Sequence, residues 1–472
     1  MKALAEILRS KRFQGAVAGI FVLQFLCLLL TTPMYEIDTN SFIRGGFSWD
    51  IFHNPLLNLV IAVCTKIWPN VWFIVSVQLL IYAFCAALLV HVLLGKYNRL
   101  WLAGLLLAAL EPVTMFYNFS LLAECFFTAL TMLSVALLIL WLRAPTPKGA
   151  VLFGLAMGLC FMSKLSAMIH LPLFGMLLLR QGTSLITRFK SLGLSLLPFA
   201  ACYLFVFFGQ KIINGGDIYT VEGRVRWDFS SAMYNSAEID APEFKRLVEP
   251  YILRDGKLVD HRELRRELSY LGYKDCVAEF ERRGIPANKG INACDSLFGA
   301  VAQQIMDAHF WAAEKQFVAD NFHFLHTLSY LDYRFTPGLH YYHPNHEYQY
   351  IDSLMTVHYG FNMAERADRI PRIWKSLDFG NVYLPIWWYL WWMALLLSLI
   401  WYLKDRTRWE LLVLAGLTAI PLLFHLVYIS YRARFLAPYL VLVGLLMLVL
   451  GKIWLERQAH KRPGNTALRD GG

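Results

Sequence analysis

The sequence predicts an all-α polytopic membrane protein with a large hydrophilic domain between two groups of spans. Of its 472 residues, 57% are hydrophobic and 17% are charged, which is far from the composition of a soluble globular protein. Aromatic residues make up 15% of the chain, and many lie near the ends of apolar runs, as they do at membrane interfaces. One long hydrophilic stretch, 210–382, separates the two groups of runs.

A helix needs roughly 20 apolar residues to cross a bilayer, and about ten segments of the chain come close to that length. The N-terminal run follows a basic segment but carries no A-x-A cleavage site, so we expect an uncleaved anchor. The run 56–68 is too short to span and predicts a helix lying in the interface. The predicted spans are 14–32, 71–94, 100–119, 121–142, 149–163, 165–180, 191–209, 383–403, 410–429 and 435–451.

The lysines and arginines orient these spans. With the N-terminus in the cytoplasm, most basic residues of the short connecting segments fall on the cytoplasmic side, as the positive-inside rule requires. Joining 149–163 and 165–180 into one broken helix would reverse every later span and spoil this agreement. The net charge of +10 therefore comes mainly from basic residues on the cytoplasmic side of the spans, and nucleic acid is not expected as a partner.

The orientation places the hydrophilic stretch outside the membrane. We expect an N-terminal transmembrane module, an extracytoplasmic cap, C-terminal transmembrane helices and a disordered cytoplasmic tail. Apolar residues recur at helical spacing in parts of the cap and predict a mainly helical domain, whereas 340–350 reads as irregular. The four regions are 1–210, 211–382, 383–455 and 456–472, and the helical segments of the cap are 242–252, 262–282 and 296–331.

The cysteines and histidines of the cap offer two further possibilities. Cys276 and Cys294 are the two cysteines of this region, and an extracytoplasmic location makes a disulfide between them possible. His340, His343 and His346 have spacings that suit a metal only in a fixed loop. No CxxC pair occurs, and we expect no metal site and no cofactor, although a divalent metal is not excluded by the pattern.

Acidic residues are the most informative feature of the predicted outer face. Glu36 and Asp38 follow the first span directly, where carboxylates usually bind or catalyse. Asp38 is a candidate general base, and Glu36 would raise the pKa of one member of the pair; the alternative is that Asp38 caps a helix starting near residue 39. Glu124 opens a span on the same side, where it would also complement the helix dipole. Glu111 precedes a proline, and the alternative to a functional role is that it hydrogen-bonds the backbone freed there.

Basic residues converge on the same side. Lys164 separates two short spans, and Tyr431, Arg432 and Arg434 lie between the last two. Arginine binds phosphate through paired hydrogen bonds, so this set predicts a site for a lipid-linked phosphate; the alternative is ordinary anchoring to lipid headgroups. Two more arginines, at 224 and 226, follow the seventh span and are candidates for lining the cavity, or for solvated loop charges.

The order of these motifs resembles the GT-C glycosyltransferases, in particular the branch of protein O-mannosyltransferases and aminoarabinose transferases. Asp38 resembles the first-loop acid, and HNPLL from His53 resembles the HPP-like start of the interfacial helix. Glu124 in LLAECFFTAL resembles the second-loop acid, and Lys164 lies where a basic residue is usual. YRARFLAP resembles the late basic element. The cap resembles nothing comparable, and the second-loop acid stands alone where some members have a pair.

The resemblance implies a membrane glycosyltransferase that uses a polyprenyl-phosphate sugar on the outer face of a bacterial inner membrane. The acceptor would be a hydroxyl of a glycan, lipid or protein of the cell envelope. Asp38, with Glu36 and Glu124, would carry catalysis, while Lys164, Tyr431, Arg432 and Arg434 would hold the donor phosphate. His53, Arg224 and Arg226 would line the donor and acceptor cavity.

Three other classes remain open on the residues alone. A lipid-sugar flippase or transporter would place charges inside the spans and show repeat symmetry. A polysaccharide ligase or polymerase of another fold would also use outer arginines, but it would not need an acid directly after the first span. A structural membrane subunit would leave the segregation of acids and bases without an explanation.

Overall fold

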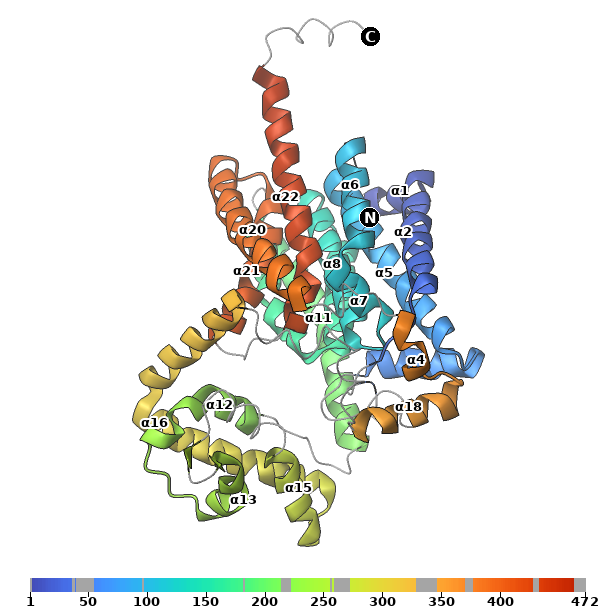
Figure 1. The fold of residues 1–472 in the computed structure, drawn as a ribbon. Coiled ribbons are helices and arrows are strands. Elements are labelled where there is room, and N and C mark those ends of the chain that lie inside the picture. The colour runs from blue at the N-terminus through green and yellow to red at the C-terminus, as the bar shows by residue number, and fades with distance from the viewer. Residues whose placement is uncertain are drawn as a thin grey trace, which may run out of the picture. The chain divides into compact units, whose positions relative to one another are not determined.

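The chain folds into two compact helical units, seen in the computed structural model of Figure 1. Unit 1 comprises 1–206, 331–421 and 433–472, and unit 2 comprises 207–330 and 422–432. The structure describes residues 2–35, 39, 55–95, 97–180, 183–213, 222–254, 257–258, 272–327, 346–369, 377–427 and 433–461.

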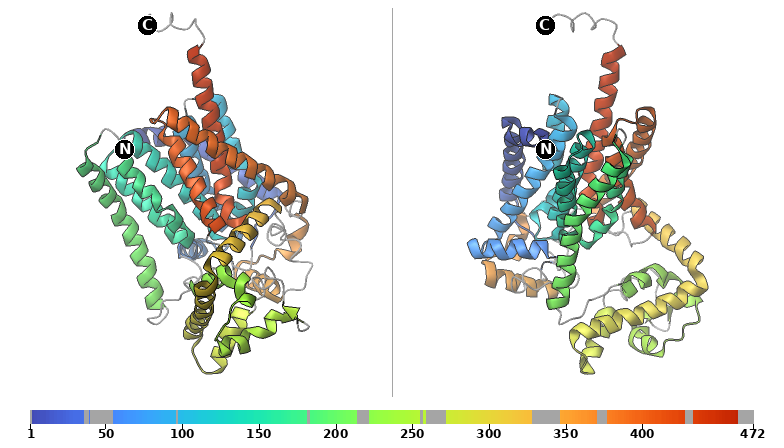
Figure 2. Two further views of the ribbon diagram at one scale, coloured as in Figure 1. Left: turned by 90° about the vertical axis from the view of Figure 1, so that its left-hand side faces the viewer. Right: turned by 180° about the vertical axis from the view of Figure 1, so that it is seen from behind.

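Unit 1 is a bundle of apolar helices, and Figure 2 shows it from two further sides. The helices up to the cap are α1 (Lys2–Arg9), α2 (Lys11–Leu30), α4 (Leu56–Ile67), α5 (Val71–Leu94), α6 (Asn98–Leu110), α7 (Pro112–Phe119), α8 (Ala123–Arg143), α9 (Pro147–Ser163), η1 (Leu165–His170), α10 (Pro172–Leu179) and α11 (Leu185–Ile213). After residue 330 follow α18 (His346–Tyr359), η5 (Ala364–Arg369), α20 (Leu377–Lys404), α21 (Trp409–Val427) and α22 (Ala433–Lys461). The last residues of α11 and α21 fall within the bounds of unit 2.

Most of each apolar run predicted to span the membrane lies in one of these helices or in a helical pair, over the residues that the structure describes. By length and composition, five of the described helices can cross a membrane, and the bent pair α6 and α7 makes a sixth. The remaining apolar segments are shorter in the part of the chain that the structure describes, so the count of ten stays a prediction. The short run after residue 55 forms helix α4, as expected for an interfacial segment.

The helices α5 and α8 form the centre of unit 1. α8 packs against α5, α9 and α22, and α5 also packs against α2 and α6. Most residues of both helices are buried by protein, whereas α2 and α11 leave most of their apolar surface exposed. Among the described helices, these exposed apolar faces are the ones that a bilayer would cover.

A break between α6 and α7 bends the predicted span 100–119 by 49°. Glu111 caps α7, since its carboxylate accepts hydrogen bonds from the N–H groups of Val113 at 3.2 Å and Thr114 at 2.6 Å. Tyr82 and Gln24 donate to carbonyl oxygens in the last turn of α6, which the following proline leaves without helical partners. Glu111 thus accepts hydrogen bonds from the backbone at this break. This agrees with the alternative in which Glu111 has a structural role only.

Basic side chains gather around one end of the bundle. Arg12, Arg143 and Lys452 come from three different helices and donate to the last carbonyl oxygens of α5, with distances of 2.8, 2.8 and 3.2 Å. Arg408 pairs with Glu456 of α22 at 2.7 Å near the same end. Cations stabilise the negative end of a helix, so these residues have a structural role as well as a place in the charge pattern.

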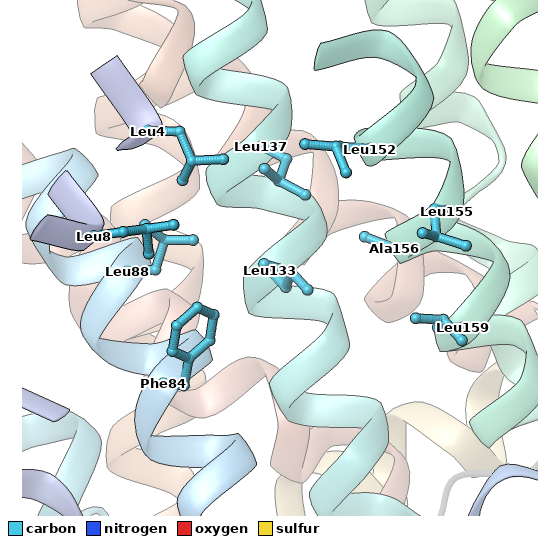
Figure 3. Close-up of a pocket in the computed structure, with 10 residues that line it drawn as sticks. All are labelled: Leu4, Leu8, Phe84, Leu88, Leu133, Leu137, Leu152, Leu155, Ala156 and Leu159. Carbon is cyan, nitrogen blue, oxygen red and sulfur yellow. The ribbon is translucent and has the colours of Figure 1, made fainter. Parts of the chain in front are cut away.

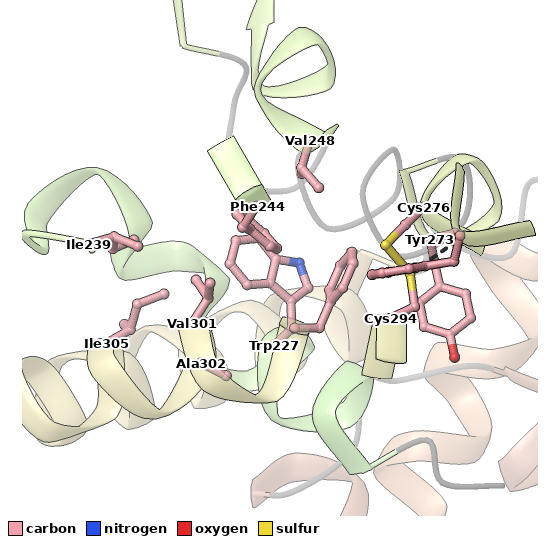
Figure 4. Packing of buried hydrophobic residues seen from close by; sticks show 12 residues of the cluster. Trp227, Ile239, Phe244, Val248, Tyr273, Cys276, Cys294, Val301, Ala302 and Ile305 are labelled. Atoms are coloured by element: carbon pink, nitrogen blue, oxygen red, sulfur yellow. Dashed lines mark hydrogen bonds between the residues drawn. A yellow bond between two sulfur atoms is a disulfide. The ribbon is translucent and has the colours of Figure 1, made fainter. Parts of the chain in front are cut away.

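Unit 2 is also mainly helical, with one short hairpin. Its elements are α12 (Glu222–Ser230), η2 (Ser231–Ser236), α13 (Pro242–Ile252), β1 (Leu253–Arg254), β2 (Lys257–Leu258), α15 (Tyr273–Arg282) and α16 (Ala287–Thr327). Figure 4 shows its core, in which Trp227 of α12 lies against Phe244 of α13 and Phe298 of α16. The buried residues recur every three or four positions, which is why the apolar spacing predicted helices here.

Two covalent and steric features fix the packing of unit 2. A disulfide joins Cys276 of α15 to Cys294 of α16, and the two residues are fully buried. α12 approaches α16 so closely that a methyl group on Gly223 would lie 1.8 Å from the carbonyl oxygen of Asp295. Glycine is therefore required at this contact, where the carboxylate of Asp295 also accepts the N–H groups of Gly223 and Arg224.

One sequence expectation about the cap region is wrong. The segment 340–350 reads as irregular, but α18 begins at His346 and includes 346–350. The aromatic and polar residues there show no helical spacing; among the described side chains of α18, the buried Met355 comes later in the chain. Residues 340–345 lie outside the described part.

Candidate functional site

An ion pair between two neighbouring helices is the centre of the candidate site. Glu124 lies in the first turn of α8, and Lys164 follows the last residue of α9. The ammonium nitrogen of Lys164 lies 2.8 Å from a carboxylate oxygen of Glu124, with side chains 15% and 4% exposed. Because α8 and α9 pack antiparallel, the start of one helix meets the end of the other, which brings together the two residues predicted to share a membrane face.

Aromatic residues surround this pair. Phe127, one turn after Glu124, lies beneath the Lys164 ammonium at 5.8 Å and stacks on His170 of η1. The ring of His170 shares a 2.7 Å hydrogen bond with the hydroxyl of Tyr439. Tyr439 therefore ties the N-terminal part of α22 to η1. The sequence carried no signal for His170 or Tyr439, because both lie within apolar runs.

The loop after α2 is attached to the turn that precedes Glu124. Met34 pairs with this turn as an isolated parallel bridge, since its N–H donates to Phe119 and its carbonyl accepts from Leu121, both at 2.9 Å. The buried hydroxyl of Thr39 donates to the carbonyl of Leu121 at 3.0 Å. The first and second loops of the predicted outer face therefore meet, and the acids predicted in the first loop fall between these two anchors in the sequence.

Several predicted site residues cannot be assigned a geometry. Those that lie outside the described residues are Glu36, Asp38, His53, Tyr431 and Arg432. Arg434 belongs to the first turn of α22, but its side chain is outside the described part. Their roles stay predictions.

The two arginines of the cap have partners within unit 2. The guanidinium of Arg224 lies 5.4 Å from the ring centre of Tyr273, over its face. Arg226 forms an exposed ion pair with Glu222 and donates to Gln303 at 3.2 Å. These contacts favour the structural alternative for Arg226, and the assignment of both residues to a substrate cavity stays a prediction.

Metal binding finds no support in the described geometry. Among the residues that the structure describes, no three His, Cys, Asp or Glu side chains lie close enough together to hold a metal ion. His340 and His343 fall outside this part, and His346 is the first residue of α18.

An apolar groove runs between α1, α5, α8 and α9, with the ten lining residues drawn in Figure 3. Leu133 and Leu137 line it from α8, and Leu155 and Leu159 line it from α9. Leu133 is nine residues beyond Glu124, which corresponds to about 13 Å along a helix. The side chains that line the groove are all apolar, so it offers no polar group to act on a substrate.

Comparison with known proteins finds no protein-family model that matches the chain, and no curated protein sequence is significantly similar to it. The fold and the site define a class no narrower than a helical protein with several helices able to cross a membrane. Any finer assignment rests on the residues themselves.

Proposed function

We propose that the protein is a membrane glycosyltransferase of the GT-C type that moves a sugar from a polyprenyl-phosphate donor to an acceptor hydroxyl. The observation that carries this proposal is the meeting of three segments: the loop after α2, the start of α8 and the end of α9. Their sequences hold the predicted first-loop acid, second-loop acid and basic residue. Membrane proteins rarely bury a charged pair beside a span end without a function for it.

The proposed reaction takes place on the outer face of a bacterial inner membrane, in the assembly of an envelope glycan, glycolipid or glycoprotein. Ten spans, with both termini in the cytoplasm, are part of this proposal. The buried disulfide of unit 2 supports an extracytoplasmic cap, because disulfides persist mainly in oxidising compartments. The basic cluster at the opposite end from Lys164 supports a cytoplasmic assignment for that end.

In the proposed mechanism, Asp38 accepts the proton of the acceptor hydroxyl as its oxygen attacks the anomeric carbon. The bond between that carbon and the phosphate oxygen breaks, and polyprenyl phosphate leaves with the electron pair. Lys164, Arg432 and Arg434 offset the negative charge that develops on the phosphate. Glu124 holds Lys164 in place through the 2.8 Å ion pair until the phosphate competes for the ammonium group.

The surroundings of Lys164 suit a donor with a lipid tail. Leu165 follows Lys164 directly and is 57% exposed, although it is a large apolar residue. A cation beside an exposed leucine at the end of a span matches a ligand with a charged head and an apolar chain. A soluble sugar nucleotide would gain nothing from the apolar part of this surface.

The proposal is tested by the release of polyprenyl phosphate from labelled donors in membranes that contain the protein. We expect release with at least one donor sugar and a loss of roughly 100-fold in Lys164→Gln, because one charge that stabilises the leaving group is gone. The matched control is Lys148→Gln, an exposed lysine at the start of α9, at the other end of that helix. Equal loss in both variants would remove Lys164 from the site.

A further inference from the structure

A buried tyrosine joins the first loop to a segment more than 300 residues later. Tyr35 is fully buried, and its hydroxyl donates a hydrogen bond to the carboxylate of Asp352 in α18. The same hydroxyl accepts the N–H of Met363 at 3.0 Å. Its ring meets Phe361 edge to face, with the ring centres 6.2 Å apart. One side chain thus holds two positions of the segment 346–369.

Further contacts hold this segment against α4 and the start of α5. The hydroxyl groups of Tyr359 and Thr65 lie 3.4 Å apart, and the guanidinium of Arg366 lies 6.0 Å from the ring centre of Trp72. Figure 1 shows α18 beside α4 at the same end of unit 1. We call residues 346–369 the strap, because they cross that end of the bundle and connect it to the first loop.

Tyr35 lies between two residues of the first loop that are bonded to the turn before α8. Its neighbour Met34 is paired with the turn before α8, and Thr39 is bonded to the same turn. In the sequence, residues 36–38 lie between Tyr35 and Thr39, and they include both first-loop acids. Whatever holds Tyr35 also holds the pairing of Met34 with the turn, and that turn leads directly into the first turn of α8, where Glu124 lies.

We propose that Tyr35 is a positioning residue and that docking of the strap on its hydroxyl holds the pairing between Met34 and the turn that leads to Glu124. The catalytic part of this inference rests on the proposed function, whereas the pairing of Met34 with the turn does not.

The structural part is tested by hydrogen–deuterium exchange at the amides of Met34 and Leu121, which report the pairing of the two loops. Tyr35→Phe keeps the ring and removes both hydroxyl bonds, and we expect exchange at these amides to rise about tenfold, a loss of about 1.4 kcal/mol in the local opening free energy. Asp352→Ala should act in the same way, whereas Asp352→Asn keeps an acceptor oxygen and should restore protection. The matched control is Tyr359→Phe, which removes a hydroxyl from the same helix without touching the first loop.

The catalytic part is tested on the same variants with a donor that the wild type uses. Tyr35→Phe should lower kcat by roughly 10- to 100-fold with little change in KM for the donor, since misplaced catalytic groups slow the chemical step. Asp352→Asn should retain most of the rate. If exchange in Tyr35→Phe equals that of the wild type, the inference is wrong whatever the activity. If exchange rises in Tyr35→Phe while the wild type turns over no donor, the positioning role of Tyr35 is supported and the proposed function is contradicted.

Discussion

The ammonium of Lys164 and the carboxylate of Glu124 lie 2.8 Å apart, across the contact between α9 and α8. Both residues were predicted from the sequence to lie on one face of the membrane protein, but not to bind each other. The pair changes the expectation for Glu124, because a carboxylate held by a neighbouring ammonium is better suited to positioning that cation than to accepting a proton.

The ion pair predicts a non-additive pair of substitutions. Lys164→Met leaves a buried carboxylate without its cation and should lower the free energy of unfolding by about 3 kcal/mol. Glu124→Gln alone should cost a similar amount, whereas Glu124→Gln combined with Lys164→Met should cost much less than the sum. Thermal unfolding of the purified variants in detergent measures this. Additive losses would contradict a direct interaction between the two side chains.

The disulfide of unit 2 predicts a covalent link that survives purification without reductant. Peptide mapping should recover Cys276 and Cys294 in one cross-linked peptide. Cys276→Ser together with Cys294→Ser should lower the stability of the cap by about 3 kcal/mol, as expected for a loop of this length. Cys202→Ser serves as the control because Cys202 is a free thiol. Recovery of both cysteines as free thiols from freshly isolated membranes would contradict the oxidised state.

The close contact between α12 and α16 predicts a severe effect of one methyl group. Gly223→Ala would place a carbon 1.8 Å from a backbone oxygen, so the two helices must move apart. We expect a loss of about 2–3 kcal/mol in the stability of unit 2. Gly299→Ala is a milder companion, since its methyl group would lie 3.2 Å from the Cα of Gly223. Equal stability of Gly223→Ala and the wild type would show that the helices do not approach as described.

Burial of Asp352 predicts a pH dependence of stability. Desolvation raises the pKa of this carboxyl group above its ordinary value of 3.8, against a smaller opposing effect of the hydrogen bond from Tyr35. The ionised form therefore costs stability at any pH above the raised pKa, and this cost disappears as the pH falls toward 3.8. Asp352→Asn should remove this component, so the stability difference between the variant and the wild type should shrink as the pH falls. A difference that does not change with pH would contradict the raised pKa.

The helices could be predicted because long apolar runs have few alternatives in a membrane protein. Runs such as 71–94 coincide with their helices, and α13 of the cap begins and ends where its apolar spacing does. An acid directly before a proline indicated the break at Glu111. The bend of 49° could not be predicted, because Tyr82 and Gln24, which bond the last turn of α6, lie in other helices. The helix at 346–350 was missed because aromatic and polar residues there gave no periodic pattern.

For the site, the sequence predicted individual residues and the side of the membrane on which they lie, but not the contacts between them. Orientation placed Glu124 and Lys164 on one face, and the structure brings them into contact. The bond between Tyr35 and Asp352 could not be predicted, because 317 positions separate the two residues and neither belongs to a motif. The hydrogen bond between His170 and Tyr439 could not be predicted for the same reason. Contacts between helices far apart in the chain produce no periodic pattern in the sequence.

The proposed function assigns to Asp38 the removal of the acceptor hydroxyl's proton during sugar transfer. The most direct measurement follows release of polyprenyl phosphate from labelled polyprenyl-phosphate sugars by membranes with the wild type or with Asp38→Asn, alongside binding of polyprenyl phosphate itself. We expect Asp38→Asn to abolish release while binding of the phosphate lipid persists. Equal turnover by both proteins would contradict the role of Asp38 and transfer the search for the base to Glu36 or Glu124.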